Sequence, residues 1–369
     1  MFWYLTLCIL LLYPFLIVYA GVRWHRSAQT VALQLSCFLL WFFMAMRASS
    51  VGVDTKYYCY VFEQLSYAPL SKVFHMVTYG SRTGNWTMDF EPGYRLYNRL
   101  AGFLSHDPQM ITIMNSSIII LLLYKLILKQ SKNAMLSIWL YITLGVFQTE
   151  MNVARNAIAI LLVYLAFQYV KKGRLWPYMI TICLAATIHK SVLVFLPLYF
   201  VFRKTSPSRT RMKRLILHAS LAGMGVLLFG SRLQALLPGI FGRYLTAQNI
   251  KMESLLVGGL YLFLVIFILF YMKNEERQKV FKECPIGIWM FTITMCCFGL
   301  NIGLKMAARL AALFGTYMII LIPNMVSKIS DEKRRHTLIL LLIIGCGVQY
   351  ILRMTINNIG GTMPYSFFW

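Results

Sequence analysis

Long apolar runs separated by short polar connections dominate the chain. A helix needs about 20 apolar residues to cross roughly 30 Å of hydrocarbon. The pattern predicts such helices at 2–20, 30–47, 110–128, 134–150, 153–170, 214–230, 254–272, 286–304, 307–327 and 337–354. The stretch 48–108 lacks a comparable run, and we expect it to form one long segment outside the membrane.

The apolar segment 175–202 does not fit a single spanning helix. Basic clusters flank both of its ends, and Lys and Arg are retained on the cytoplasmic side of a membrane. We therefore predict two half-length segments, 175–188 and 191–202, that meet at His189 and Lys190. Fourteen helical residues rise only about 21 Å, so this hairpin would re-enter the membrane without crossing it.

The predicted fold is thus an all-α polytopic membrane protein with about ten full transmembrane helices plus the re-entrant hairpin, twelve helices in total. Composition supports this class, because 59% of the residues are hydrophobic, 13% are charged and the mean hydropathy is +0.64. Such values exclude a soluble enzyme, a disordered chain and an ordinary nucleic-acid-binding domain. No linker or internal repeat marks a boundary, so we expect a single integral membrane domain over 1–369.

The formal net charge of +24 follows the membrane topology. Of the 36 Lys and Arg residues, 22 lie in or beside the short connections, with only five of the 12 acids. This asymmetry places those connections in the cytoplasm and both termini outside, with the segment 48–108 on the outer face. The connections are 21–29, 129–133, 171–174, 203–213, 273–285 and 328–336.

No cofactor or metal motif is present in the sequence. The eight cysteines form no C-x-x-C pair, and no H-E-x-x-H, G-x-S-x-G, Walker-type or G-x-G-x-x-G motif occurs. We expect neither a metal nor a cofactor, and these absences weigh against a peptidase, a hydrolase and a nucleotide-driven pump.

Charged residues at the outer helix ends are the candidate functional groups, because a charge within a membrane segment is costly. Arg47 closes the second helix and could pair with Asp54 at the interface. Glu91 precedes Pro92 and could be an ordinary helix-start charge with Arg95 four residues on. The functional interpretation makes Glu91 a base or a sugar-hydroxyl acceptor and Arg95 a phosphate contact.

Two further pairs lie at predicted outer ends. Asn152 and Arg155 share a helix face after Glu150 in a connection with almost no loop. Arg155 could simply neutralise Glu150, but a tight turn needs neither charge, which favours a functional role. Lys305 and Arg309 are also on one face, where two like charges repel unless an anion lies between them; snorkelling to lipid headgroups is the alternative. Nearby, the Gly299-x-x-x-Gly303 pattern favours helix packing over chemistry.

His189, at the predicted hairpin tip, suits a proton acceptor, although a satisfied core histidine is the alternative. Arginines at headgroup level bind phosphate bidentately and can stabilise a pyrophosphate leaving group without metal. A carboxylate or histidine nearby could take the proton of an attacking hydroxyl. Together these residues indicate group transfer from a polyprenyl-pyrophosphate carrier at the outer face.

At the same residues the chain resembles the EpsG-like family of Wzy-type polymerases of bacterial exopolysaccharide, capsule and O-antigen. The similarity is carried, in order, by Arg47…Gly52-x-Asp54…Tyr58, Glu91-Pro92-Gly93-Tyr94, Asn152-x-x-Arg155-x-x-Ile158-Ala159, His189-x-Ser191, and Arg309 with Tyr317. Asn156 departs from the family pattern, which has glutamine after the arginine.

The resemblance implies a GT-C-like membrane glycosyltransferase in the bacterial inner membrane. It would move a growing glycan from undecaprenyl pyrophosphate onto a lipid-linked repeat unit, alongside a flippase and a chain-length regulator. The hypothesis assigns the donor pyrophosphate to Arg47, Arg155 and Arg309, with Arg95 and Lys305 as further contacts. It assigns catalysis to Asp54, Glu91 or His189, and sugar binding to Tyr58, Tyr94 and Asn152.

Other functions remain open at this point. A polysaccharide ligase would differ only in its acceptor. A transporter or flippase of lipid-linked oligosaccharide would more often show internal repeats, and a membrane O-acyltransferase would place its key residues near the cytoplasm.

Overall fold

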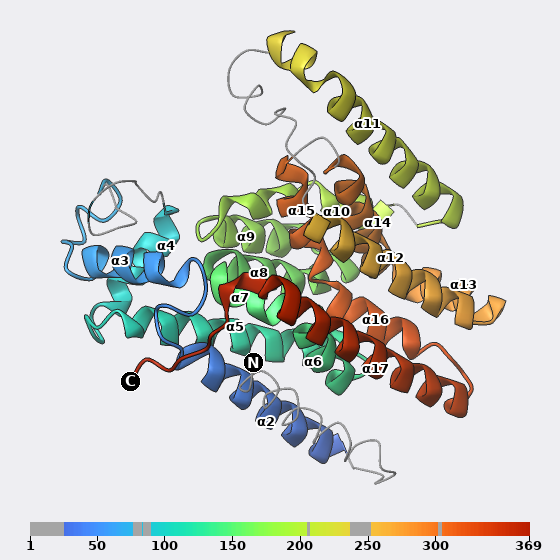
Figure 1. The fold of residues 1–369 in the computed structure, drawn as a ribbon, viewed down its shortest axis with the longest axis horizontal. Helices are drawn as coiled ribbons and strands as arrows, with labels where there is room; N and C mark the ends of the chain where they lie inside the picture. The colour runs from blue at the N-terminus through green and yellow to red at the C-terminus, as the bar shows by residue number, and fades with distance from the viewer. Residues whose placement is uncertain (1–25, 77–82, 84–89, 205–206, 237–251, 302–304) are drawn as a thin grey trace. The chain divides into compact units, whose positions relative to one another are not determined.

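The computed structural model describes residues 26–76, 83, 90–204, 207–236, 252–301 and 305–369 (Figure 1). Within these residues every regular element is a helix, which confirms the all-α prediction for the described part of the chain. The elements are α2 (Arg26–Ala45), α3 (Thr55–Ser66), α4 (Pro92–Ala101), α5 (Gln109–Gln130), α6 (Ala134–Thr143), α7 (Val146–Asn152), α8 (Ala154–Lys171), α9 (Leu175–Ala186), η1 (Lys190–Phe195), α10 (Leu198–Lys204), α11 (Arg209–Leu236), α12 (Met252–Tyr271), α13 (Asn274–Glu283), α14 (Pro285–Leu300), α15 (Lys305–Gly315), α16 (Met318–Val326), α17 (Glu332–Asn357) and η3 (Ile359–Gly361).

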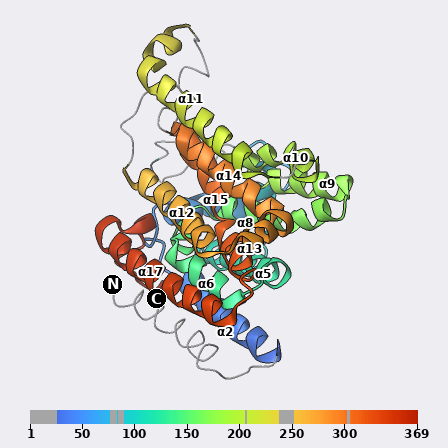
Figure 2. The same ribbon diagram turned by 90° about the vertical axis from the view of Figure 1, so that its right-hand side faces the viewer.

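The chain forms two compact units. The first contains the described residues up to Tyr199 together with those from Leu341 onward, and the second spans Phe200–Leu340. In the first unit, α5 packs against both α2 and α8, and α8 packs against α9 (Figure 1). In the second unit, α14 packs against α11 and α15 (Figure 2).

Two described helices, α5 and α17, are long and apolar enough to cross a membrane by themselves. Two bent pairs raise the number to four if each pair forms one span: α13 with α14, bent by 90°, and α15 with α16, bent by 44°. These spans and the composition are consistent with a polytopic membrane protein. The predicted number of twelve helices exceeds what the described spans establish, and it stays a prediction.

The predicted continuous helix over 134–150 is wrong. It is broken into α6 and α7 at Gly145, whose φ of +79° lies in the left-handed region that glycine adopts without a steric penalty. The Asn133 side chain caps the start of α6 by accepting a hydrogen bond from the Leu136 N–H at 3.0 Å. The run has no proline or charged residue beside Gly145, so its hydrophobic pattern predicts one continuous helix.

Other predicted boundaries shift for similar reasons. The run 307–327 is divided between α15 and α16, and the expected connection 273–285 contains α13. The outer segment 48–108 contains two helices, α3 and α4, whose amphipathic sequences are too short to span a membrane. The predicted first helix, 2–20, lies outside the described residues, as does most of the stretch 231–253 between the predicted helices 214–230 and 254–272.

The chain reverses direction at the predicted hairpin tip. After α9 ends at Ala186, His189 adopts an extended conformation (φ −154°, ψ 109°) and η1 begins at Lys190. The Tyr178 hydroxyl donates to the carbonyl oxygen of Phe195 at 2.7 Å, and the Tyr178 and Tyr199 ring centroids lie 5.4 Å apart. The two arms therefore lie side by side, with His189 at the turn.

Small residues bring α11 and α14 into close contact. A Cβ atom at Gly223 would clash with the Gly299 carbonyl oxygen, and one at Gly299 would lie 2.5 Å from the Ser220 hydroxyl. Close backbone approach at small residues is how helices associate in membranes. Gly299 thus serves helix packing, as the sequence predicts, while Gly303 lies outside the described residues.

We expect Gly223→Ala to lower the stability of the protein in detergent by about 1–3 kcal/mol, because the added methyl overpacks the helix contact. Gly225→Ala is the matched control, since a Cβ atom there meets nothing within 4 Å. The control should be neutral or stabilising by up to about 1 kcal/mol, owing to the higher helix propensity of alanine. Thermal unfolding of both variants would test this, and equal destabilisation would contradict the packing role.

Candidate functional site

Glu91 occupies the N-cap position of α4, yet its side chain does not cap the helix. The N–H groups of Gly93 and Tyr94 instead donate to the carbonyl oxygen of Thr187, at 2.9 and 3.2 Å. Pro92, at the first helical position, has no N–H to satisfy. The turn after α9 therefore accepts the hydrogen bonds of the first N–H groups of α4. The Glu91 carboxylate is left available for other contacts.

The Glu91 carboxylate joins α8 to the hairpin tip. Arg155 Nη1 donates to Glu91 Oε2 at 2.6 Å, and the Lys190 backbone N–H donates to Glu91 Oε1 at 3.1 Å. His189 Nδ1 lies 3.2 Å from the same Oε1. The side chains of Glu91, Arg155 and His189 are 10%, 15% and 26% exposed, so this network is shielded but accessible at the histidine.

These contacts keep Glu91 ionised. Burial by itself would raise the pKa of Glu91, but the His189 imidazole, the Arg155 guanidinium and the Lys190 N–H together stabilise the carboxylate more strongly. The pKa of Glu91 falls from 4.5 to about 2. At neutral pH the carboxylate is an anion and a weak proton acceptor.

Aromatic rings surround the Arg155 guanidinium. Its central carbon lies 4.2 Å from the centroid of Phe90, 5.8 Å from that of Tyr94 and 6.0 Å from that of Tyr58. Cations are attracted to the faces of such rings, and a flat guanidinium stacks on them. The Asn115 side chain donates to the Tyr94 hydroxyl at 2.8 Å, which fixes one of these rings.

Arg47 and Asn152 link helix ends around this network. Arg47 is 4% exposed and donates to the carbonyl oxygens of Met44 and Met151, with Nη2 2.8 Å from the latter. Asn152 Nδ2 donates to the carbonyl oxygen of Gly360 at 2.8 Å. These contacts join the ends of α2 and α7 and tie α7 to the C-terminal segment.

Asp54 and Arg95 lie on the two short helices of the outer segment. Asp54 precedes α3 without capping it, and its carbonyl oxygen accepts from the N–H of Tyr58. Arg95 donates to the carbonyl oxygens of Phe90, at 2.6 Å, and Phe74, at 3.0 Å. The contact expected between Glu91 and Arg95 as an ordinary helix-start pair is thus replaced by the pair of Glu91 with Arg155.

Lys305 and Arg309 both lie on α15 in the second unit. Arg309 is exposed, while the Lys305 side chain lies outside the described part of the chain. Among the described residues no group of three or more His, Cys, Asp or Glu could hold a metal ion. The roles of Lys305 and Arg309 as phosphate ligands stay predictions from the sequence.

The start of α4, the start of α8 and the hairpin tip thus meet in the first unit, where the Glu91 carboxylate contacts both Arg155 and His189. A model of the EpsG family matches residues 30–367 of the chain. The chain belongs to the EpsG family. Neither the curated proteins nor the solved structures contain a match to it. The match confirms the family resemblance, and EpsG membership indicates a polysaccharide-polymerase-like membrane protein.

Sequence reasoning missed several contributors to this EpsG-family site. Phe90 stacks on Arg155, the Thr187 carbonyl holds the start of α4, and the Lys190 N–H binds Glu91. An aromatic residue immediately before Glu91-Pro92-Gly93 was a usable signal for Phe90. The two backbone groups carry no signature in the sequence, because any residue type could supply them.

The network should make stability depend on pH through Glu91. Because the folded-state pKa of Glu91 is lowered to about 2, its contribution is complete above about pH 4.5 and is lost as the pH falls towards 2. The shift corresponds to roughly 3 kcal/mol. Unfolding of the wild type and Glu91→Gln in detergent should therefore show a stability difference at pH 7 that shrinks below pH 4.5.

Glu275→Gln is the control for this measurement, since Glu275 is an exposed acid on α13. It should match the wild type across the pH range. A Glu91→Gln difference that stays constant down to pH 3 would show that the charge of Glu91 does not stabilise the fold.

Proposed function

We propose that this protein is a membrane glycosyltransferase of the GT-C type that polymerises lipid-linked oligosaccharide repeat units into exopolysaccharide, capsule or O-antigen. The donor is a growing glycan on undecaprenyl pyrophosphate, and the acceptor is a second lipid-linked repeat unit. The reaction takes place at the outer face of the bacterial inner membrane, with both termini outside. A flippase would supply the repeat units, and a chain-length regulator would act beside the enzyme.

The observation that carries this proposal is the Glu91 carboxylate shared by Arg155 and His189. Glu91 Oε1 lies 3.2 Å from His189 Nδ1, which has no hydrogen-bond partner in the described structure. A small rotation of the imidazole would form a hydrogen bond that favours the tautomer with its proton on Nδ1. Nε2 is then the proton acceptor. We therefore assign the role of base to His189 and a positioning role to Glu91, whose lowered pKa makes it a weak base.

In the proposed step the acceptor hydroxyl loses its proton to His189 Nε2 as its oxygen bonds to the anomeric carbon of the donor. The bond from that carbon to the pyrophosphate oxygen breaks, and the leaving group takes the electron pair. Arg155 stabilises the resulting charge. Its five N–H donors allow it to bind a phosphate oxygen while one of them remains on Glu91.

Sugar hydroxyls are proposed to bind beside this network. Ser191 Oγ, Asn156 Oδ1 and Asn152 Oδ1 are buried and make no hydrogen bond within the described part of the chain. Buried polar atoms rarely lack a partner, so these positions suit a ligand rich in hydroxyl groups. Tyr58 and Tyr94 are 7% and 0% exposed, so they would act by enclosing Arg155 beside the sugar. Asp54 is a further candidate for a sugar hydroxyl. Arg47 and Arg95, which donate to backbone carbonyls, would act by holding helix ends in place.

The first test is the surface glycan of a deletion strain complemented with variants. Wild type should restore a ladder of polymer lengths, whereas Arg155→Ala and Arg309→Ala should leave single lipid-linked repeat units, because the pyrophosphate charge is no longer stabilised. Arg174→Ala, at an exposed arginine before α9, is the control and should restore the ladder.

The outcomes separate the candidate activities. Wild-type ladders from Arg155→Ala and Arg309→Ala would overturn the pyrophosphate assignment for each residue. Long polymer that persists on its carrier after deletion would indicate a ligase. Unchanged and fully attached glycan after deletion would contradict a role in polymerisation.

The second test distinguishes the base from its positioning partner. With purified protein and lipid-linked repeat units, His189→Gln should slow polymerisation by about 10²–10⁴-fold at saturating substrate, the usual contribution of a general base. Glu91→Asp should retain partial activity with the same pH profile. A larger loss for Glu91→Gln than for His189→Gln, with the pH profile unchanged in the histidine variant, would make Glu91 the base.

A further inference from the structure

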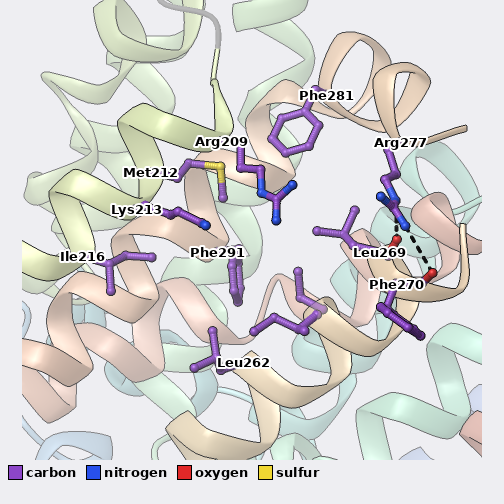
Figure 3. A pocket seen from close by; sticks show the side chains of 12 residues that line it. Arg209, Met212, Lys213, Ile216, Leu262, Leu269, Phe270, Arg277, Phe281 and Phe291 are labelled. Atoms are coloured by element: carbon purple, nitrogen blue, oxygen red, sulfur yellow. Dashed lines mark hydrogen bonds between the residues drawn. The ribbon is translucent and has the colours of Figure 1, made fainter. Parts of the chain in front are cut away.

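The second unit contains a cavity of about 360 Å³ between α11, α12, α13 and α14. Its floor is apolar and includes Leu262, Phe270 and Phe291. Its other side is basic, because Arg209 and Lys213 line it from the first two turns of α11. Figure 3 shows both cationic groups pointing into the cavity, across from the apolar side chains. None of the lining residues is acidic.

Arg209 and Lys213 have no counter-charge within the described part of the chain. Neither side chain makes a hydrogen bond or an ion pair there, although they lie four residues apart on one helical face, where like charges repel. The third cation of the cavity is already used: Arg277 Nε donates to the Leu269 carbonyl oxygen at 2.6 Å, at the end of α12. An anion placed between Arg209 and Lys213 would relieve their repulsion.

The apolar floor of the cavity suits the acyl chain of a lipid as well as its headgroup. Leu262, Ile266 and Phe270 follow one another at intervals of four residues, so they form a stripe about 12 Å long on α12. These three side chains are 40%, 54% and 82% exposed. A stripe of exposed apolar side chains leading away from two cations matches an acyl chain attached to a phosphate.

We propose that this cavity binds an anionic glycerophospholipid, with its phosphate between Arg209 and Lys213 and an acyl chain along the α12 stripe. The basic connection that contains Arg209 is expected on the cytoplasmic side, where basic pockets between membrane helices bind anionic headgroups. This site is separate from the Glu91 network, and it does not depend on the proposed glycosyl transfer. Its role is to anchor the second unit to an anionic leaflet.

The test compares lipids and matched variants of the full chain. Native mass spectrometry and thermal unfolding in detergent would be measured with phosphatidylglycerol, phosphatidylcholine or inorganic phosphate added. We expect phosphatidylglycerol to bind and stabilise the wild type in preference to phosphatidylcholine. Arg209→Gln combined with Lys213→Gln should weaken phosphatidylglycerol binding by about 30-fold, since each cation near an anionic headgroup contributes about fivefold.

Arg211→Gln combined with Arg214→Gln is the control, because it removes the same charge from the same turns outside the cavity. It should bind phosphatidylglycerol like the wild type. Leu262→Trp, which keeps both cations and fills the floor at a partly exposed position, should also lose the lipid. This variant keeps the proposal testable if the charge variant does not fold.

Three results would overturn the proposal. Equal losses in the cavity and control pairs would mean that net charge alone attracts the lipid. Full lipid binding by Leu262→Trp would exclude the apolar floor as the acyl site. Equal stabilisation by inorganic phosphate and phosphatidylglycerol would identify a soluble anion as the ligand in place of a lipid.

Discussion

A single shielded carboxylate organises the candidate site of this protein. Glu91 is only 10% exposed, and an ionised carboxylate in such a position is unstable unless charges and hydrogen bonds compensate for lost hydration. Arg155, His189 and the Lys190 N–H supply that compensation from two other segments. The outer segment, α8 and the hairpin tip are therefore fixed to one another by the need to satisfy one anion.

The same anion underlies the chemical roles that we propose for the neighbouring groups. A carboxylate that remains ionised near neutral pH can hold an imidazole in one orientation and keep a guanidinium inside an aromatic enclosure. Thr187 also holds this arrangement in place, since its carbonyl oxygen accepts hydrogen bonds from two N–H groups at the start of α4. Rotation of the hairpin tip would break the hydrogen bonds at the start of α4 and the contacts of Glu91 together. The position of His189 is therefore fixed, as proton transfer would require.

The helical class and the reversal at His189 could be predicted from the sequence. Glu91, Arg155 and His189 could be singled out as candidates, because charged groups in apolar surroundings are rare enough to stand out. The sequence did not allow their pairing to be predicted. Local spacing favoured Arg95 as the partner of Glu91, but Arg155, 64 residues away, forms the ion pair. The break at Gly145 was missed because apolar periodicity continues through it, and a left-handed glycine leaves no other trace.

The arginines illustrate why residue type alone could not separate structural from functional positions. The last carbonyl groups of every helix lack partners within that helix. Several arginines satisfy such carbonyls. Arg47 binds the carbonyl oxygen of Met151 at the end of α7. At the end of α12, Arg277 binds the carbonyl oxygen of Leu269, and Arg334 binds that of Tyr271. Arg334 also pairs with a carboxylate, that of Glu276, at 3.5 Å. Arg155 differs in its surroundings, because it pairs with Glu91 at 2.6 Å among the rings of Tyr58, Phe90 and Tyr94. The surroundings of a guanidinium, and not its residue type or its depth in the fold, therefore distinguish the arginines that hold helix ends from Arg155, the residue proposed to contact a substrate.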